Sequence, residues 1–207
     1  MAALLEPQIA VPSPYVPNEP TRLRWTWNEF LGLLEREDNL DRRLLLLDGD
    51  IYEMASPNAP HVTSMTLLAA ILPAVFGNRA AVRNQAALPI GLDTEPFPDF
   101  AIASGPIRDY ATRHPHSDEI LLVIEVSDST LRFDLNVKSH LYAAAGFREY
   151  WVLDIENRKL HVHRDPIADD ASPRGHRYGT LQVLGDGESI APLAAADSLL
   201  AIADMLP

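Results

Sequence analysis

Two acidic residues and one lysine have the types and positions that metal-assisted hydrolysis requires. Asp99 follows Pro98 and precedes a short apolar run, and Glu125 interrupts a longer apolar run that is typical of a buried strand. A carboxylate among such residues is costly to bury unless it is paired or binds a metal ion. Lys138 lies on the helix expected after that strand, which can fold back over the strand ends and bring positive charge to both carboxylates.

The chemistry that fits these three residues is hydrolysis of a phosphodiester. A hard cation such as Mg²⁺ or Mn²⁺ is usually held by one or two carboxylates, and water completes its coordination. Asp99 and Glu125 supply the pair of carboxylates. A lysine beside the ion can orient or deprotonate the attacking water, or offset charge on the phosphate. We therefore expect Asp99, Glu125 and Lys138 to converge in one cleft at the end of a sheet.

Lysine usage favours a chemical role for Lys138. The chain has 17 basic residues, of which only Lys138 and Lys159 are lysines. An ammonium is a compact charge whose pKa shifts readily, whereas a guanidinium stays charged and forked. The alternative is a pair between Asp134 and Lys138 on a solvated helix face, which would be worth about a few tenths of a kcal/mol.

Length and composition indicate one domain with a substantial core. The chain has 207 residues, 47% of them hydrophobic, and five prolines in its first 20 residues. These prolines predict an extended N-terminal arm over residues 1–20, followed by a domain over residues 21–207. The absence of cysteine excludes disulfides and thiolate metal sites. Neither a signal peptide nor a run of roughly 20 apolar residues is evident, so we expect a cytoplasmic protein with no membrane contact.

The net charge of −12 counts against a broad electrostatic grip on nucleic acid, because phosphate binding draws on lysine and arginine. Arginines do occur in close pairs, at positions 22 and 24, 42 and 43, and 79 and 83. These pairs leave open a basic groove on an otherwise acidic protein.

Periodicity, capping and turn signals predict an α/β fold with a mixed sheet. Thr26 and Glu29 have the spacing of a capping box, and Asp48-Gly49 is a strong hairpin signal. Pro73 predicts a kink or an early end within a long helix. The predicted helices cover residues 27–37, 61–76, 132–145 and 198–206. The predicted strands cover residues 43–47, 50–54, 81–85, 88–92, 100–103, 120–126, 149–154, 159–163 and 177–184. Helices thus alternate with strands and hairpins.

Several motifs together resemble the PD-(D/E)XK nuclease superfamily, and more narrowly its Uma-two branch of restriction-endonuclease-like proteins. They are Pro98-Asp99, Glu125 in the run Val-Ile-Glu-Val-Ser, the spacing of Asp134, Lys138 and Tyr142, and residues 146–154. The resemblance extends from about Trp25 to the C-terminus. It implies a restriction-endonuclease-like mixed β-sheet flanked by helices, and a Mg²⁺- or Mn²⁺-dependent endonuclease that acts on DNA.

The resemblance also implies roles for individual residues. Asp99, Glu125 and the carbonyl of Val126 would hold the metal ion. The lysine that usually follows the glutamate by two residues is Ser127 here, and the sequence is similar to a variant in which this lysine has moved to the next helix. Lys138 fits that variant and would serve the attacking water.

Two further residues match the branch and one position departs from it. Gln85 matches a glutamine often seen before the Pro-Asp strand, and His61 matches a histidine after the hairpin. Both are expected to support the site. Where the branch commonly reads Glu-Leu-Ile-Asp-Gly-Glu, residues 45–50 read Leu-Leu-Leu-Asp-Gly-Asp, so an acidic residue is lost at Leu45.

Two functions from different classes follow. The leading hypothesis is a metal-dependent endonuclease, favoured by the intact set of Asp99, Glu125 and Lys138. The second is a catalytically degenerate relative that binds DNA or protein as an accessory module, favoured by Leu45 and the negative charge. Because cutting both strands of a duplex calls for two sites, we also expect a two-fold homodimer.

Other candidate sites are weaker. His161 and His163 are two residues apart on a strand and share a face, which is compatible with metal binding. We interpret them as ordinary positions on the solvated side of a hairpin. The sequence has no glycine-rich phosphate loop, and Ser127 and Ser129 lack the flanking glycines of a serine hydrolase. Trp151, in an apolar strand, is expected in the core.

Overall fold

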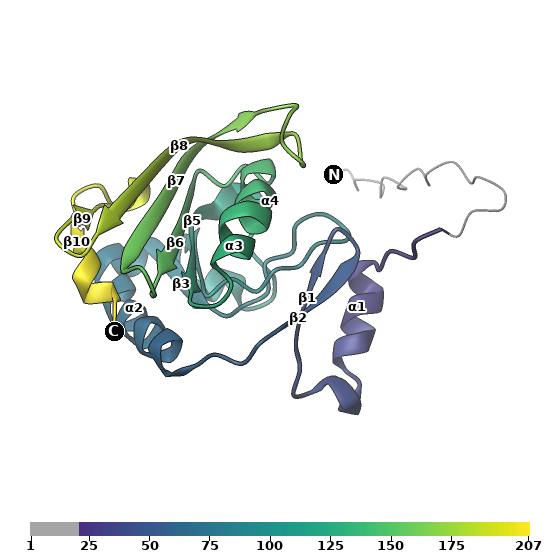
Figure 1. Ribbon diagram of the computed structural model, residues 1–207. Coiled ribbons are helices and arrows are strands. Elements are labelled where there is room, and N and C mark those ends of the chain that lie inside the picture. Colours follow the sequence, from purple (N-terminus) through teal and green to yellow (C-terminus); the bar gives the residue numbers. More distant parts are fainter. Residues whose placement is uncertain (1–20) are drawn as a thin grey trace, which may run out of the picture.

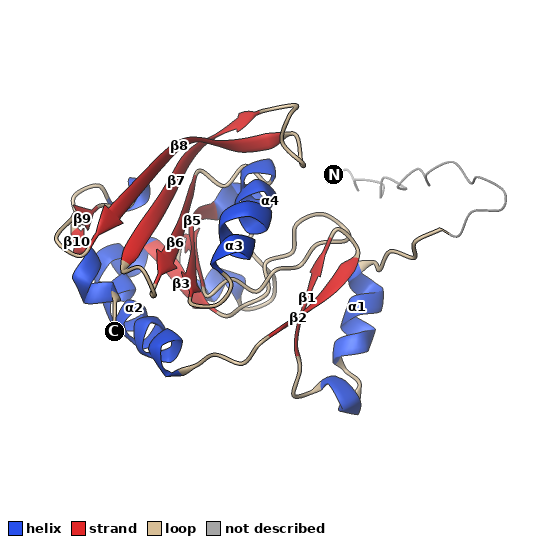
Figure 2. Ribbon diagram, viewed as in Figure 1, coloured by secondary structure: helices blue, strands red, loops and turns tan. Residues whose placement is uncertain are grey.

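The computed structural model describes residues 21–207, in which a six-stranded mixed sheet is covered by helices on both faces (Figures 1 and 2). The predicted arm over residues 1–20 lies outside the described residues. The strands have the order β3-β4-β5-β6-β7-β8, and every neighbouring pair is antiparallel except β5 and β6. Their bounds are β3 Ala80–Asn84, β4 Phe100–Ser104, β5 Ile120–Ser127, β6 Glu149–Asp154, β7 Lys159–Ala168 and β8 His176–Gly185.

Alternation along the strands gives the sheet two buried faces. Leu122, Ile124 and Val126 of β5 belong to one core, which includes residues of α2 (Ala59–Phe76). The other core lies against the helix that follows β5. It contains Val123 of β5 together with Tyr150 and Val152 of β6. Trp151 is fully buried, as the sequence predicts. The fold is thus the predicted α/β architecture with a mixed sheet.

The parallel pair β5 and β6 requires a crossover connection, because two parallel strands cannot be joined by a hairpin. Three helical segments provide it: α3 (Leu131–Phe133), a π turn (Asp134–Lys138) and α4 (Ser139–Ala144). The sequence predicts one helix over residues 132–145. The structure has that helix with a π turn inside it, and π turns of this kind are frequent at functional sites.

A small N-terminal unit packs beside the sheet. It contains α1 (Trp27–Leu34), capped by the predicted box of Thr26 and Glu29, and the hairpin of β1 (Arg43–Leu47) and β2 (Asp50–Met54). The hairpin turns at Asp48 and Gly49, which both have positive φ, as a two-residue primed turn requires. Strand β1 is buried on both sides. Leu44 and Leu46 contact the α1 side, and Leu45 and Leu47 join the core beneath the sheet.

Two sequence predictions about elements are wrong. Residues 88–92 form a loop in which the amides of Leu88 and Ile90 donate to the carbonyls of Pro96 and Thr94, and Leu88 is buried in the core without joining the sheet. Residues 198–206 form a short strand, β10 (Leu200–Ala201), paired with β9 (Ser189–Ile190), and a single 3₁₀ turn. Helix α2 contains Pro73 and ends at Phe76, the end predicted for this helix, so of the two effects expected of Pro73 an early end does not occur.

The expectation about membrane-spanning length is also wrong. Among residues 21–207 the helical stretch Ala59–Arg79 is long and apolar enough to cross a membrane by length and composition, with a mean hydropathy of 1.5. Core helices pass the same test, and α2 places Leu68, Leu72 and Phe76 in the core against the sheet. This single helix is therefore weak evidence for a membrane span.

The two strand histidines are not solvated, contrary to the interpretation drawn from the sequence. His163 is 8% exposed and packs against Tyr150 and Tyr178, with ring centroids 5.5 and 5.6 Å away. Its Nε2 is buried and has no hydrogen-bond partner among residues 21–207. Burial, with smaller contributions from His161 and His140, lowers the pKa of His163 to about 4.

We predict that His163 makes the fold sensitive to acid. Because its pKa is lower in the folded state than in the unfolded chain, the unfolded chain binds more protons between about pH 6.5 and 4, and stability falls as the pH falls through that window. Urea unfolding measures how much the free energy of unfolding falls on acidification. This fall should be about 1 to 3 kcal/mol smaller in His163→Phe than in the unmutated protein. An equal fall in the two proteins would contradict this assignment.

Candidate active site

Strand register places Asp99 opposite Glu125. In the antiparallel pair of β4 and β5, Phe100 faces Ile124, so one step further along each strand brings Asp99 and Glu125 face to face. Directly opposed residues have Cβ atoms about 4.5–5.5 Å apart and point to the same side of the sheet. The amide of Val126 donates to Asp99 Oδ2 at 2.8 Å, which holds the aspartate at this position. The two carboxylates therefore meet on the sheet face covered by the crossover helix.

Lys138 reaches Glu125 from that helix. Its Nζ lies 2.9 Å from Glu125 Oε2 and 3.0 Å from Asp134 Oδ1, and the Lys138 side chain is 6% exposed. Asp134 and Lys138 do form the i,i+4 pair considered in the sequence. The pair is buried, so the alternative in which it lies on a solvated helix face is wrong. Tyr142, one turn further on, donates to Glu125 Oε1 at 2.8 Å. Both oxygens of Glu125 are thus satisfied by the same helix.

Two contacts fix Asp134 in turn. The hydroxyl of Thr130 donates to Asp134 Oδ2 at 2.6 Å, and the hydroxyl of Tyr150 donates to the Asp134 carbonyl at 3.1 Å. In the sequence, Asp134 and Tyr142 are parts of a motif, and Asp134 is also the partner of Lys138 in the alternative surface pair. They are eight residues apart and each is four residues from Lys138. This spacing is the signal that the sequence offers, but it does not reveal that these side chains surround Glu125.

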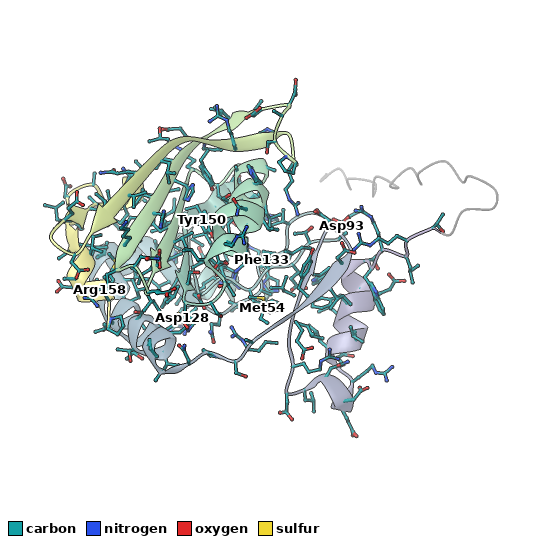
Figure 3. The ribbon with its side chains drawn as sticks, in the orientation of Figure 1. Met54, Asp93, Asp128, Phe133, Tyr150 and Arg158 are labelled. Carbon is teal, nitrogen blue, oxygen red and sulfur yellow. The ribbon has the colours of Figure 1, made fainter. Side chains whose placement is uncertain are left out.

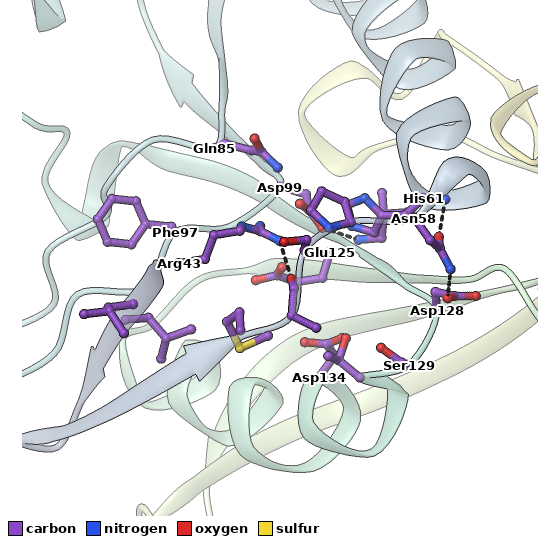
Figure 4. Close-up of a pocket in the computed structure, with 18 of the residues that line it drawn as sticks. Arg43, Asn58, His61, Gln85, Phe97, Asp99, Glu125, Asp128, Ser129 and Asp134 are labelled. Atoms are coloured by element: carbon purple, nitrogen blue, oxygen red, sulfur yellow. Dashed lines mark hydrogen bonds and ion pairs between the residues drawn. The ribbon is translucent and has the colours of Figure 1, made fainter. Parts of the chain in front are cut away.

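A cavity of about 340 Å³ opens between the N-terminal unit and this edge of the sheet (Figure 4). The predicted site residues all line it: His61, Gln85, Asp99, Glu125, Val126 and Lys138. The opposite wall comes from the hairpin and the segment after it, including Arg43, Leu45 and Met54. Met54 and Asp128, which follows β5, are two lining residues labelled in Figure 3. The structure thus brings the predicted residues together in one cavity.

The two supporting residues lie beside Asp99. His61, near the start of α2, places Nε2 3.3 Å from Asp99 Oδ2. Its Nδ1 is buried without a hydrogen-bond partner in the described part of the chain. The amide of Gln85, which has a positive φ of 45°, donates to the carbonyl of Asp99 at 3.1 Å. In Figure 4 both side chains adjoin Asp99 in the cavity.

The carboxylates have opposite pKa shifts. Burial raises the pKa of Glu125 to about 7; Lys138 opposes this, and the charges of Asp134 and Asp99 add to it. Burial also acts to raise the pKa of Asp99, but the hydrogen bond and charge of His61, with the amide of Val126, outweigh it and lower this pKa. For Lys138, burial is outweighed by Glu125 and Asp134, so its pKa is raised. At neutral pH Asp99 is ionised and Lys138 is an ammonium.

The donor set fits a hard divalent cation. Asp99 Oδ1 has no hydrogen-bond partner among residues 21–207, whereas Oδ2 is held by two donors. Asp99 and Glu125 supply two carboxylates, and Val126 adds a backbone carbonyl. Mg²⁺ is commonly bound by one or two carboxylates with several waters retained. Within the same residues no three histidine or acidic side chains are arranged as a metal site, so water and backbone ligands would have to complete the shell.

Comparisons with known proteins show the family and the fold. Residues 27–202 match the profile of the Uma2 family, described as "Putative restriction endonuclease". The chain is also similar to the crystal structure of a protein from Anabaena variabilis ATCC 29413, described as a putative nuclease belonging to DUF820. The TM-score is 0.64 at 17% sequence identity, and the match covers 87% of this chain and 96% of that one. This likeness shows a shared fold. No curated protein matches the chain.

We predict that Lys138 is essential for stability at neutral pH. In Lys138→Met, Glu125 and Asp134 lose their cation, and breaking a buried pair by removing one partner costs about 3–5 kcal/mol. The cost should be smaller at pH 5 than at pH 8, because protonation of Glu125 removes one of the two uncompensated charges. Urea unfolding at both pH values measures it.

The matched control for this experiment is Lys159→Met. Lys159 is the other lysine and is exposed on β7, so its replacement should change stability by less than about 0.5 kcal/mol. If the two variants were equally stable at pH 8, the ion pairs of Lys138 would contribute little to the fold.

Proposed function

Because the chain belongs to the Uma2 family, described as putative restriction endonucleases, we propose that it is a metal-dependent endonuclease that hydrolyses phosphodiester bonds in DNA. The observation that carries this proposal is the presence of Asp99 and Glu125 in the lining of one cavity, with the Lys138 ammonium 2.9 Å from Glu125. Two carboxylates and the Lys138 ammonium line a cavity of about 340 Å³. Among the side-chain clusters of the described residues, this one suits phosphate chemistry best.

Asp99, Glu125 and the Val126 carbonyl would hold Mg²⁺ or Mn²⁺. When bound, such an ion polarises a phosphoryl oxygen and lowers the pKa of a bound water. His61 and the Val126 amide hold Oδ2 of Asp99, which leaves Oδ1 without a hydrogen-bond partner among residues 21–207. Tyr142 fixes the other carboxylate by donating to Glu125 Oε1.

Lys138 acts in this proposal as a fixed positive charge. Its raised pKa keeps it protonated at neutral pH, so it is a poor proton acceptor. It can instead donate a hydrogen bond to the attacking water and stabilise negative charge that develops on the phosphate. Of the three roles that the sequence suggests for Lys138, orientation of the water and charge stabilisation therefore fit its surroundings better than deprotonation.

A second candidate, a catalytically degenerate module that binds DNA or protein, is favoured by one specific observation. Leu45 is buried and lines the cavity, at the position where the resemblance leads one to expect a glutamate. One wall of the site is therefore apolar in this chain, where a relative would present a carboxylate.

We predict that the protein nicks supercoiled plasmid in Mg²⁺ or Mn²⁺ and that a chelator stops the reaction. Asp99→Asn and Glu125→Gln should each lower the rate about 10²-fold or more, since each removes a charged ligand oxygen. Lys138→Met should lower it to a similar degree. Lys138→Arg should rescue poorly, because a guanidinium differs from an ammonium in shape. Lys159→Met is the control and should cut normally.

Thermal unfolding of every variant separates loss of activity from loss of fold. Full activity in Asp99→Asn would exclude the metal site. No cleavage by the unmutated protein with either metal, on plasmid or on single strands, would favour the accessory module instead.

We propose also that the protein forms a two-fold dimer, which would supply one site for each strand of a duplex. Large apolar side chains are exposed on and beside the N-terminal unit, among them Leu23, Leu40 and Leu92, which are 80%, 69% and 65% exposed. Light scattering at micromolar concentration should give twice the chain mass, and replacing these three leucines with serine should give the monomer. A monomer of the unmutated protein would contradict this proposal.

A further inference from the structure

Arg43 is a cavity residue that the reaction described above does not use. It is the first residue of β1 and shares a strand face with Leu45, two positions on. Both line the cavity from the hairpin side, across from the two carboxylates. Figure 4 shows the Arg43 side chain extending from the hairpin toward the part of the cavity where Glu125 lies.

Two arginines line the cavity, Arg42 and Arg43. Arg43 is the one that forms no ion pair with a carboxylate of residues 21–207. Its Nη1 donates to the Ala55 carbonyl at 2.9 Å, and within residues 21–207 it forms no ion pair. Its neighbour Arg42 lies 2.8 Å from Glu53, in a bidentate pair. A guanidinium has five N–H donors, so most of those of Arg43 remain available.

The charge of the cavity makes an unpaired arginine informative. Four acidic residues line it: Asp99, Glu125, Asp128 and Asp134. Lys138 is engaged with two of them. A phosphate entering this cavity would be repelled by the acidic wall unless positive charge met it from another side. A guanidinium suits this task, because its planar fork matches two phosphate oxygens.

We propose that Arg43 binds the phosphate of a nucleic-acid strand seated in the cavity and positions it against Asp99 and Glu125. The inference rests on the proposed nuclease function and adds a substrate contact from the N-terminal unit. It also gives the hairpin a role in substrate binding. The metal-binding side of the site and the phosphate-binding side then come from separate parts of the chain.

The alternative is that Arg43 is purely structural and holds the segment after β2 through the Ala55 carbonyl. Arg24 is a matched control for this alternative. It lies in the same unit, donates to one backbone carbonyl, that of Asp48, at 3.0 Å, and forms no ion pair in the described residues. It does not line the cavity. Arg43→Gln and Arg24→Gln remove the same charge and the same kind of contact.

The test measures binding and turnover separately. The ligand is a fluorescent single-stranded oligodeoxynucleotide in Ca²⁺, which replaces Mg²⁺ to suppress cleavage, titrated over a range of NaCl concentrations. We expect Arg43→Gln to bind about tenfold more weakly, with the slope of log K against log salt reduced by about 0.7, the value for one lost contact to a single strand. Arg43→Lys should restore the slope but only part of the affinity. Arg24→Gln should match the unmutated protein in both.

Steady-state cleavage in Mg²⁺ gives the second readout. Arg43→Gln should raise KM more than it lowers kcat, because a binding contact is lost and the metal-holding residues are intact. The proposal is overturned if Arg43→Gln and Arg24→Gln have the same salt slope and KM, or if the unmutated protein does not bind the oligonucleotide. If the protein binds through Arg43 but cuts nothing, the nuclease function fails and the phosphate site stands.

Discussion

The buried charge of Glu125 is the constraint on which strands β5 and β6 and the crossover helix between them depend. A carboxylate that is 3% exposed on the face of a sheet is tolerated only when other groups satisfy it. Tyr142 and Lys138 do so from the crossover helix, and Asp134 holds Lys138. The crossover between β5 and β6 therefore has two effects: it makes a parallel strand pair possible, and it delivers one ammonium to one carboxylate.

This arrangement couples stability to chemistry. Lys138 compensates Glu125 within the fold, and a divalent cation at the same carboxylate would share that task. Burial raises the pKa of Glu125 to about 7, so a proton competes with any cation for it in mild acid. Asp99 is different, because His61 and the Val126 amide keep its pKa low. The two neighbouring carboxylates are thus adapted by their surroundings to different protonation states.

The hairpin completes the site because β1 is buried on both sides. Leu44 and Leu46 contact the α1 side, and Leu45 and Leu47 join the core under the sheet. This packing attaches the N-terminal unit firmly enough for its residues to form a cavity wall. Leu45 makes that wall apolar, while Arg43, on the same face, gives it positive charge.

The sequence by itself determined many of the local elements and which residues are candidates for the site. The capping box at Thr26, the Asp48-Gly49 turn and the alternation along β5 and β6 each depend on near neighbours, and the structure has all of them. The Pro-Asp and Glu motifs likewise predicted Asp99 and Glu125 as candidate site residues, and the structure brings both to one cavity. Only the tertiary structure decided that residues 88–92 form a loop, that His163 is buried, and that Lys138 contacts Glu125. These outcomes depend on which faces meet across strand register and the crossover, and periodicity along one segment carries no information about its distant partners.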